Sequence, residues 1–376
     1  MFKVLILTNP LNHEGGIANY YNLFFKSFRS KAFNIEQFNI GSRAYLFYYP
    51  AIKRILYLFY YVFDLFMFII KLSFDNKIKI IQFSPSLIPV PLIRDGIFIL
   101  IAKLYKKQVV IFYRGWKTPT LKIINSQSFV RNIFNAIFQN NTLQVVLSRS
   151  FKKDLENLNS KFINTIRVTT TAIDKKRIII TNHKNKNKVI NVLFLGRVQD
   201  LKGVEEIIEA IRQLNEEDKL KYFNFTIAGH ENKVGYISKL MGFLDEAIIA
   251  NKKVNFPGRV LGIAKYELYA KSDIFLLPSY TEGCPNSLLE ALASGLFCIT
   301  TPVGAMKDLI DPKKNGLFVQ VMNHTDIVKA LNYTLMNYNY NSNRLQNAKK
   351  YSEQFDIKQQ VRFFDELYQD VMKSEK

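Results

Sequence analysis

The sequence contains few of the residues that build disulfide frameworks or metal centres. Its 376 residues include two cysteines, Cys284 and Cys298, and four histidines, at positions 13, 183, 230 and 324. Two cysteines cannot form a disulfide framework, which is typical of a protein from a reducing compartment. The histidines lack metal-ligand spacing, so we expect no metal site. The apolar run after Lys3 is too short for a signal core, so we expect no signal peptide.

Acidic residues are scarce in the first half of the chain. Residues 1–180 carry 26 Lys and Arg against 8 Asp and Glu, a balance of +18, whereas residues 181–376 carry 26 against 23, a balance of +3. Such an excess implies an anionic partner, either a membrane surface or a nucleic acid. No recognised nucleic-acid-binding motif is present, which disfavours a nucleic acid. Compositional drift towards Lys, Asn and Ile is the alternative explanation.

The length exceeds that of one typical core, so we expect two domains. Short apolar runs followed by glycine-containing loops and helical spacing predict strands and helices that alternate, as in parallel α/β sheets. We place the first domain at residues 1–180, a polar linker, TNHKNKNK, at 181–188, and the second domain at 189–355. A C-terminal helix at 356–376 is expected to pack back on the first domain.

One segment of the first half is unusually apolar. Between Ile55 and Ile70 the only charge is Asp64. This run is shorter than the roughly 20 residues that a bilayer-spanning helix needs. A helix of this kind either lies in a membrane interface or is buried in the core, and the two can hold for different faces. The predicted membrane contacts are Phe63 and Phe66 with the preceding cations, Lys53 and Arg54.

The stretch from Ser272 to Gly304 reads as strand, loop, helix and strand, the unit that builds parallel sheets. Glu282 falls in the loop, and Glu290 falls about one turn inside the helix. Free N–H groups at a helix N-terminus attract anions. Bare N–H donors for a phosphate and two carboxylates for hydroxyls together suit a sugar nucleotide. Two solvated acids beside a capped helix are the alternative reading of this spacing.

Other polar residues follow other predicted strands. Arg197 and Lys202 flank a strand-to-helix turn with two glycines, and such a pair of cations suits a diphosphate. Arg114 ends the strand at 108–113, where it could meet a phosphate or carboxylate or remain a solvated arginine. Gly15 and Gly16 precede a helix and either allow the backbone to approach a ligand or form a tight turn.

The chain resembles glycosyltransferase family 4, a large retaining group. Between Val189 and Val319 the resemblance is carried, in order, by GRVQDLKG, TIAGHE, VNFPGRV, DIFLLPSYTEGCPNSLLEALASG, VGAMKDLI and KKNGLFV. In residues 1–180 it rests on topology and on GGIAN at 15–19. It implies an α/β fold of the GT-B type, in which two Rossmann-like doubly wound domains face each other across a cleft.

The resemblance also implies roles for the candidate residues. Arg197 and Lys202 would hold the donor diphosphate, Glu282 would contact hydroxyls of the transferred sugar, and Glu290 would contact the ribose. The remaining donor contacts would be Gly15 and Gly16 in the first domain, the loop residues Gly283, Cys284, Pro285, Asn286 and Ser287, and the turn at Arg259 and Val260, which would approach the base. Many relatives have a catalytic-site histidine where Arg114 stands, so Arg114 is a candidate first-domain site.

The resulting prediction is a retaining hexosyltransferase that needs no cofactor besides its co-substrate, a nucleotide-diphosphate sugar. The enzyme would move a hexose or N-acetylhexosamine to a lipid-linked glycan in bacterial surface polysaccharide synthesis. The basic first half and the apolar helix predict a cytoplasmic protein, peripheral on the anionic inner face of the plasma membrane. A soluble acceptor, a nucleotide-sugar epimerase of related fold and a non-catalytic transferase-like subunit are the alternatives.

Overall fold

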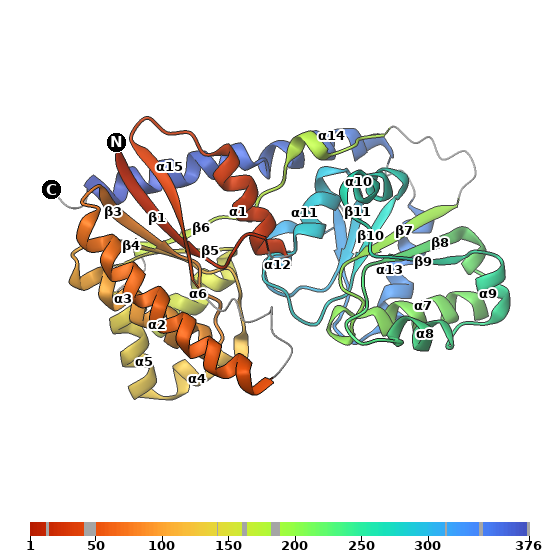
Figure 1. The fold of residues 1–376 in the computed structure, drawn as a ribbon. Helices are drawn as coiled ribbons and strands as arrows, with labels where there is room; N and C mark the ends of the chain where they lie inside the picture. Colours follow the sequence, from red (N-terminus) through yellow and green to blue (C-terminus); the bar gives the residue numbers. More distant parts are fainter. Residues whose placement is uncertain are drawn as a thin grey trace. The chain divides into compact units, whose positions relative to one another are not determined.

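The protein is described by a computed structural model that covers residues 1–12, 15–40, 50–140, 142–159, 164–181, 189–312, 314–337 and 341–373, without the side chains of 50–55, 118 and 341–343. The chain forms two compact units. The first comprises Met1–Thr171 and Ile357–Lys376, and the second comprises Ala172–Asp356. Each unit is a parallel sheet flanked by helices (Figure 1).

The sheet of the first unit has the strand order β2-β1-β3-β4-β5-β6, and its inner strands β1, β3, β4 and β5 are largely buried. The strands are β1 (Phe2–Thr8), β2 (Phe33–Asn39), β3 (Ile78–Phe83), β4 (Gln108–Phe112), β5 (Leu143–Val146) and β6 (Ile166–Val168). The helices are α1 (Gly16–Ser27), α2 (Pro50–Phe74), α3 (Pro89–Leu104), α4 (Thr118–Ser126), α5 (Ser128–Phe134), α6 (Arg149–Leu158) and α15 (Ile357–Lys373).

The sheet of the second unit has the order β12-β11-β10-β7-β8-β9. Its strands are β7 (Ile190–Leu195), β8 (Phe223–Ala228), β9 (Val254–Gly258), β10 (Ile274–Leu277), β11 (Phe297–Thr300) and β12 (Gly316–Phe318). Its helices are α7 (Val204–Glu216), α8 (Tyr236–Met241), α9 (Glu246–Ala250), α10 (Gly262–Lys271), α11 (Asn286–Ala293), α12 (Met306–Leu309), α13 (His324–Met336) and α14 (Asn341–Gln354). The direction of strand addition reverses between β7 and β10, which makes that gap the topological switch point.

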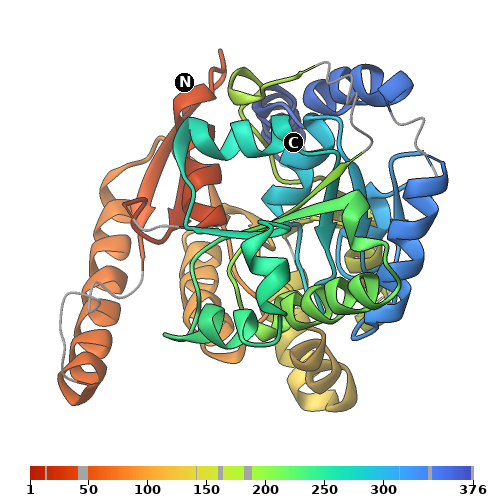
Figure 2. The ribbon, with the colours of Figure 1, turned by 90° about the vertical axis from the view of Figure 1, so that its right-hand side faces the viewer.

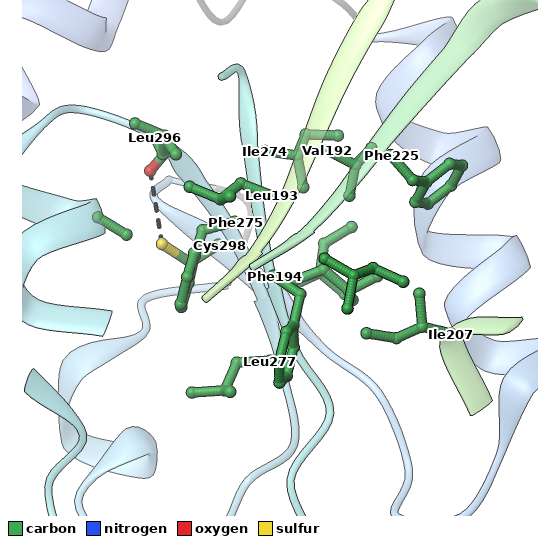
Figure 3. Close-up of a cluster of buried hydrophobic side chains, with 14 of the residues drawn as sticks. Val192, Leu193, Phe194, Ile207, Phe225, Ile274, Phe275, Leu277, Leu296 and Cys298 are labelled. Carbon is green, nitrogen blue, oxygen red and sulfur yellow. Dashed lines mark hydrogen bonds between the residues drawn. The ribbon is translucent and has the colours of Figure 1, made fainter. Parts of the chain in front are cut away.

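The core of the second unit forms around β7 and β10. Phe194 of β7 and Phe275 of β10 are almost fully buried, and Ile207 of α7 packs in the same cluster. Figure 3 shows these side chains together with Cys298, whose thiol donates to the Leu296 carbonyl at 3.6 Å. Burial raises the pKa of Cys298 far above its ordinary value, so this thiol is an inert core group. The rigid centre of the sheet fixes the strand ends that carry the candidate site.

The C-terminal helix α15 is built into the first unit. Phe364 makes edge contacts with Phe24 of α1 at a centroid distance of 5.4 Å, and Tyr368 donates to Gln82 Oε1 at 2.6 Å. Gln360 donates to Thr169 at 2.7 Å, close to the point where the chain leaves this unit. In Figure 1, α15 lies beside α1 in the first unit.

The boundary between the units differs from the expected one. The first domain was expected to run to residue 180, but residues 172–181 contact the second unit. The Ile173 amide donates to the Phe355 carbonyl at 2.9 Å, and Thr181 Oγ1 donates to Ala270 O at 2.7 Å. Polar composition alone could not reveal these contacts. Of the expected linker, residues 182–188 lie outside the described residues.

Helix α2 turns its one acidic residue inward and exposes many of its apolar residues to solvent. Asp64, Phe68 and Leu72, spaced four apart, are buried, and the Phe68 ring packs against Phe38 of β2 and Phe98 of α3. By length and composition, residues 56–74 could cross a membrane, whereas the sequence-based count stopped at Ile70. The packing against β2 and α3 would be lost if α2 spanned a bilayer. Figure 2 shows α2, in orange, on the outside of the first unit.

Candidate functional site

Polar residues gather where β7 and β10 end, on either side of the switch point of the second sheet. Gly196 and Arg197 follow β7, and Ser279 follows β10 after Pro278. Because parallel strands end at the same edge of a sheet, these residues share one edge. Open α/β sheets bind ligands at this place, so topology brings together motifs that lie about 80 residues apart.

Two turns at this edge are packed against each other. The turn Asp200–Lys202 leads through Gly203 into α7, and Gly203 has a φ of +69°. A Cβ at Gly203 would lie 2.2 Å from the Pro278 carbonyl oxygen, so only glycine allows this approach. The Tyr280 amide donates to the Leu201 carbonyl at 3.0 Å. The backbone therefore fixes the Lys202 turn beside the loop that carries Glu282.

Lys202 and Glu282 form an ion pair across these turns. The Lys202 ammonium donates to Glu282 Oε1, and Ser279 Oγ donates to the same oxygen at 3.0 Å. The side chains are 18% and 10% exposed, so both charges are largely withdrawn from water. The pair leaves Glu282 Oε2 outside these contacts. Charge-assisted contacts of this kind hold side chains in a defined position.

Arg197 lies at the same edge but in a different environment. Its side chain is exposed, and its guanidinium group forms neither a hydrogen bond nor an ion pair with the described residues. The two predicted diphosphate cations are therefore unlike. Lys202 is already neutralised by Glu282, whereas Arg197 presents its full charge to solvent.

The loop from Gly283 to Ser287 runs from Glu282 into α11. The Ala305 amide donates to the Gly283 carbonyl at 2.8 Å, and Gly304, with a φ of +55°, allows its backbone to approach Glu282. Helix α11 begins at Asn286 with Pro285 at the N-cap, and no side chain caps it. An end of this kind suits an anion. Cys284 packs against the core and forms no disulfide.

Glu290, in α11, is buried and has its own set of partners on α10. Lys265 donates to Glu290 Oε1 at 2.6 Å, and Tyr269 OH donates to Oε2 at 3.1 Å. Tyr266 OH reaches Oε1 at 3.5 Å. Burial alone would lower the pKa of Lys265, but the Glu290 carboxylate raises it above its ordinary value. Lys265 is therefore charged at neutral pH, and both oxygens of the Glu290 carboxylate accept hydrogen bonds from α10.

Sequence reasoning named both glutamates but missed the residues that hold them. Ser279 lies within the motif DIFLLPSYTEGCPNSLLEALASG but was not singled out. Lys265 and Tyr269 lie on α10, outside the motifs that carry the resemblance. The expectation of two solvated acids is wrong, because each glutamate is paired with a lysine. Arg259, which is exposed, and Val260, which is half-buried, lie in the connection from β9 to α10, the helix that carries Lys265.

The first unit holds the other predicted residues. Gly15 and Gly16 are exposed at the N-terminal end of α1, and Gly15 has a φ of +147°. Arg114 follows β4 and is only 9% exposed, so the expectation of a solvated arginine is wrong. Phe63 and Phe66 are exposed, at 42% and 59%, whereas the side chains of Lys53 and Arg54 lie outside the described residues. No cluster of His, Cys, Asp and Glu suited to a metal ion occurs in the described part of the chain.

Residues 175–355 match the family model described as "Glycosyl transferases group 1", and they fall within the second unit. The chain is 30% identical over 159 residues to an uncharacterized glycosyltransferase of Methanocaldococcus jannaschii, covering 42% of this chain and 39% of that protein. The chain spans between 39% and 62% of the length of the first curated relatives it matches.

A second relative has a named reaction. It is the GalNAc-alpha-(1->4)-GalNAc-alpha-(1->3)-diNAcBac-PP-undecaprenol alpha-1,4-N-acetyl-D-galactosaminyltransferase of Campylobacter jejuni subsp. jejuni. The two sequences are 30% identical over 170 residues, which cover 44% of each chain.

Solved structures resemble the chain over its whole length. Sucrose-phosphate synthase from Thermosynechococcus elongatus has a TM-score of 0.73 at 14% identity, with complete coverage of both chains. Anabaena HepE, solved in complex with UDP and glucose, has a TM-score of 0.67 at 14% identity, again with complete coverage. At these identities the likeness concerns the fold alone. The predicted fold class, GT-B with two Rossmann-like α/β domains, is confirmed.

Proposed function

We propose that this protein, whose residues 175–355 match the family model of the glycosyl transferases group 1, transfers a hexose or N-acetylhexosamine from a nucleotide-diphosphate sugar to a lipid-linked glycan, with retention of configuration. The observation that carries the proposal is the Lys202–Glu282 pair at the switch point of the second sheet. A cation for phosphate and a carboxylate for hydroxyls stand side by side there, as a donor of this class requires. Membership of family 4 in particular stays a prediction.

The diphosphate would be held by Arg197 and Lys202. Arg197 offers an exposed planar fork, and Lys202 offers a point charge already fixed by Glu282. When a diphosphate arrives, Lys202 can donate to both anions, because an ammonium group has three protons. Backbone N–H groups of the loop from Gly283 to Ser287 would add donors at the uncapped end of α11.

The sugar and nucleoside would be held by the two glutamates. Glu282, with Oε2 outside its contacts to Lys202 and Ser279, would accept hydrogen bonds from hydroxyls of the transferred sugar. Glu290 would accept from the two ribose hydroxyls. Its Oε2 retains a lone pair beside the bond from Tyr269, and its Oε1 could exchange the long 3.5 Å contact with Tyr266 for a ribose hydroxyl while it keeps the bond from Lys265. Arg259 and Val260 would approach the base, and Gly15 and Gly16 would contact the phosphates from the first unit.

This arrangement supports transfer by positioning and charge rather than by a protein nucleophile. Cys284 packs against the core, and retaining transfer by same-face attack requires no thiol, so we propose no covalent intermediate on sulfur. The bond between the anomeric carbon and the leaving phosphate oxygen would break while the acceptor hydroxyl attacks from the same face. The leaving phosphate would take the acceptor's proton. Lys202 and Arg197 would stabilise the charge that develops on that phosphate, and no divalent cation is proposed.

The first unit would face a membrane that carries the acceptor. Exposed apolar side chains follow α2 and continue on α3, which packs beside it (Figure 1). They are Tyr57, Leu58, Phe59, Val62, Phe63, Phe66 and Met67 on α2, and Val90, Ile93, Ile97, Leu100 and Leu104 on α3. Together with the +18 balance of residues 1–180, this surface suits an anionic bilayer interface, so we propose a cytoplasmic protein peripheral on the inner membrane face. The undecaprenol-linked acceptor in the name of the Campylobacter relative supports a lipid-linked substrate.

The donor can be tested with the purified chain. We expect one nucleotide-diphosphate sugar from a panel to raise the melting temperature, because a ligand that binds only the folded state stabilises it. UDP sugars are the first to try, since the Anabaena structure holds UDP. The same compound should then be consumed in the presence of undecaprenyl-diphosphate glycans. Failure of every nucleotide sugar to bind would contradict the proposal, and turnover without any acceptor would instead favour an epimerase.

A further inference from the structure

Arg114 occupies a built position at the end of β4. Its amide donates to the Pro85 carbonyl at 3.1 Å, and the next residue, Gly115, forms a bridge with Ser86. A Cβ at Gly115 would lie 2.4 Å from Ser86 Oγ, so the two strand ends are in direct contact. The backbone at Arg114 is therefore fixed from both sides, and its side chain points into the unit rather than into solvent.

The guanidinium group of Arg114 lies between aromatic rings. Its central carbon is 4.1 Å from the centroid of Tyr20, on α1, and 4.9 Å from that of Phe112, on β4. Nη2 donates to Thr171 Oγ1 at 3.1 Å. Nε and Nη1 are buried and have no hydrogen-bond partner among the described residues, and the same is true of Tyr20 OH. A charged group that can make five hydrogen bonds thus makes one.

This environment is unfavourable for a cation unless something completes it. Withdrawal of a guanidinium group from water costs more than two ring contacts and one neutral hydroxyl return. Buried charges in proteins are normally paired with an opposite charge. Among the described residues no ion pair is recorded for Arg114, in contrast to Lys202 and Lys265 in the second unit. An anion from outside the chain would satisfy Nη1 together with the second proton of Nη2, since these two groups form one side of the planar fork.

The approach to this group runs past the start of α1. Tyr20 lies one turn beyond Gly16, and Gly15, Gly16 and Ile17 are exposed. A Cβ at Gly15 would meet no atom of the described residues within 4 Å, so these residues leave space beside this end of α1. Rotation of the Tyr20 side chain, whose hydroxyl is held by no described residue, would open the guanidinium group to that space.

We propose that Arg114 is the cation of a phosphate-binding subsite in the first unit, which takes a phosphate group of the acceptor. The inference rests on the proposed transferase function, but the subsite belongs to the first unit alone and needs none of the donor residues. Arg114 would bind two phosphate oxygens through Nη1 and the second proton of Nη2, while the first proton of Nη2 keeps its bond to Thr171. The phosphate would come from the diphosphate of a lipid-linked acceptor. The alternative source is the diphosphate of the donor, and the second measurement below distinguishes the two.

The first measurement is stability without any ligand. If the arginine serves only the fold, its replacement should destabilise the protein. If it is an uncompensated buried charge, its replacement should not, because apolar replacement of buried ions is often neutral or stabilising. We expect Arg114→Met to melt at the wild-type temperature or above it in phosphate-free buffer. Lys117→Met, an exposed cation three residues away, is the control for the charge change. A melting temperature that falls by several degrees in Arg114→Met but not in Lys117→Met would overturn the inference. That result is also expected if a carboxylate of the chain itself pairs with Arg114.

The second measurement is anion binding with the donor site filled. With UDP saturating, added inorganic pyrophosphate should raise the melting temperature of wild type and of Lys117→Met but not of Arg114→Met. Arg114→Lys, which keeps the charge but loses the fork, should show a reduced shift. UDP alone should stabilise all four proteins equally. If pyrophosphate raises the melting temperatures of wild type and Arg114→Met equally, the inference is overturned. If UDP no longer stabilises Arg114→Met, the phosphate bound by Arg114 belongs to the donor instead.

The third measurement separates this subsite from the proposed function. Arg114→Met should raise the KM for an undecaprenyl-diphosphate acceptor at least tenfold, with an unchanged KM for the donor. An unchanged acceptor KM would contradict the subsite even though transfer itself continues. Absence of both transfer and UDP binding in the wild-type chain would contradict the proposed function instead, so the two failures give different results.

Discussion

The two units share one architecture but treat their charges in opposite ways. In the second unit the buried or half-buried site charges form pairs, Lys202 with Glu282 and Lys265 with Glu290. In the first unit Arg114 is buried without an ion pair among the described residues, and α2 and α3 expose apolar side chains. Paired charges suit a site pre-organised for a polar donor. An unpaired cation and an apolar surface suit a charged, lipid-borne partner.

The largest loss of activity is expected when the Lys202–Glu282 ion pair at the switch point of the second unit is broken. Lys202→Met should lower the transfer rate by about 100-fold to 1,000-fold, because it removes a cation from the developing phosphate charge. It also leaves Glu282, 10% exposed, with only Ser279 as a partner. The measurement is kcat at saturating donor, with exposed Lys233→Met as a control. A near-normal kcat in Lys202→Met would show that this pair is structural.

A smaller loss is expected at the other pair. Lys265→Met leaves the Glu290 carboxylate buried with tyrosine donors only, so its cost should be about 1–3 kcal/mol, the range for a buried group deprived of its partner. If Glu290 binds ribose, this loss appears mainly in the KM for the donor, roughly tenfold, and little in kcat. Substitution of a 2′-deoxynucleotide should weaken binding to wild type more than to the variant. Identical discrimination in both proteins would remove Glu290 from the ribose.

Substitutions in the apolar surface of the first unit should have an effect similar to or smaller than that of Lys265→Met. Replacing Phe63 and Phe66 with Ser should weaken binding to phosphatidylglycerol vesicles about tenfold. A Phe side chain contributes roughly 1.5–3 kcal/mol when it is fully withdrawn from water, and a smaller contribution is expected from rings that enter the interface only in part. Ser at Leu261 and Ile263, exposed apolar residues of the second unit, is the matched control. Unchanged sedimentation with vesicles would exclude α2 as the membrane contact. UDP binding should be unaffected in every variant.

No effect is expected from removal of divalent metal. Positive charge at the proposed diphosphate site comes from Arg197, Lys202 and the uncapped start of α11. Transfer should therefore proceed at the same rate after dialysis against EDTA. A rate that falls with EDTA and returns with Mg²⁺ or Mn²⁺ would contradict this expectation.

The sequence predicted the strands and motifs well because both have local signals. The alternation of apolar runs and glycine turns located β1, β7 and β10, and GRVQDLKG and the E-x7-E block located Lys202 and Glu282. Strand β2 was missed because FNIEQFN has few apolar residues and lies at the sheet edge. Edge strands need less apolar character because one side faces solvent.

The partners within the site could not be predicted in the same way. Lys265 and Tyr269 reach Glu290 from a neighbouring helix, and no motif spacing records contacts of this kind. Burial was also hidden, since Arg114 and Asp64 are polar residues that the fold places inside. For α2 the sequence left open whether the helix is buried or lies in a membrane interface, and it did not show that Asp64 faces inward. These features depend on packing between elements, which the local pattern does not determine.

Amide hydrogen exchange of the full chain, with and without the nucleotide sugar that it turns over, would test the placement of the donor most directly. A donor bound at the switch point should slow exchange in the Asp200–Lys202 turn, in the loop from Gly283 to Ser287 and in α11 around Glu290. It should leave α2 and α3 unchanged. Slowed exchange confined to other segments, with these three unprotected at saturating donor, would contradict the assignment of Lys202, Glu282 and Glu290.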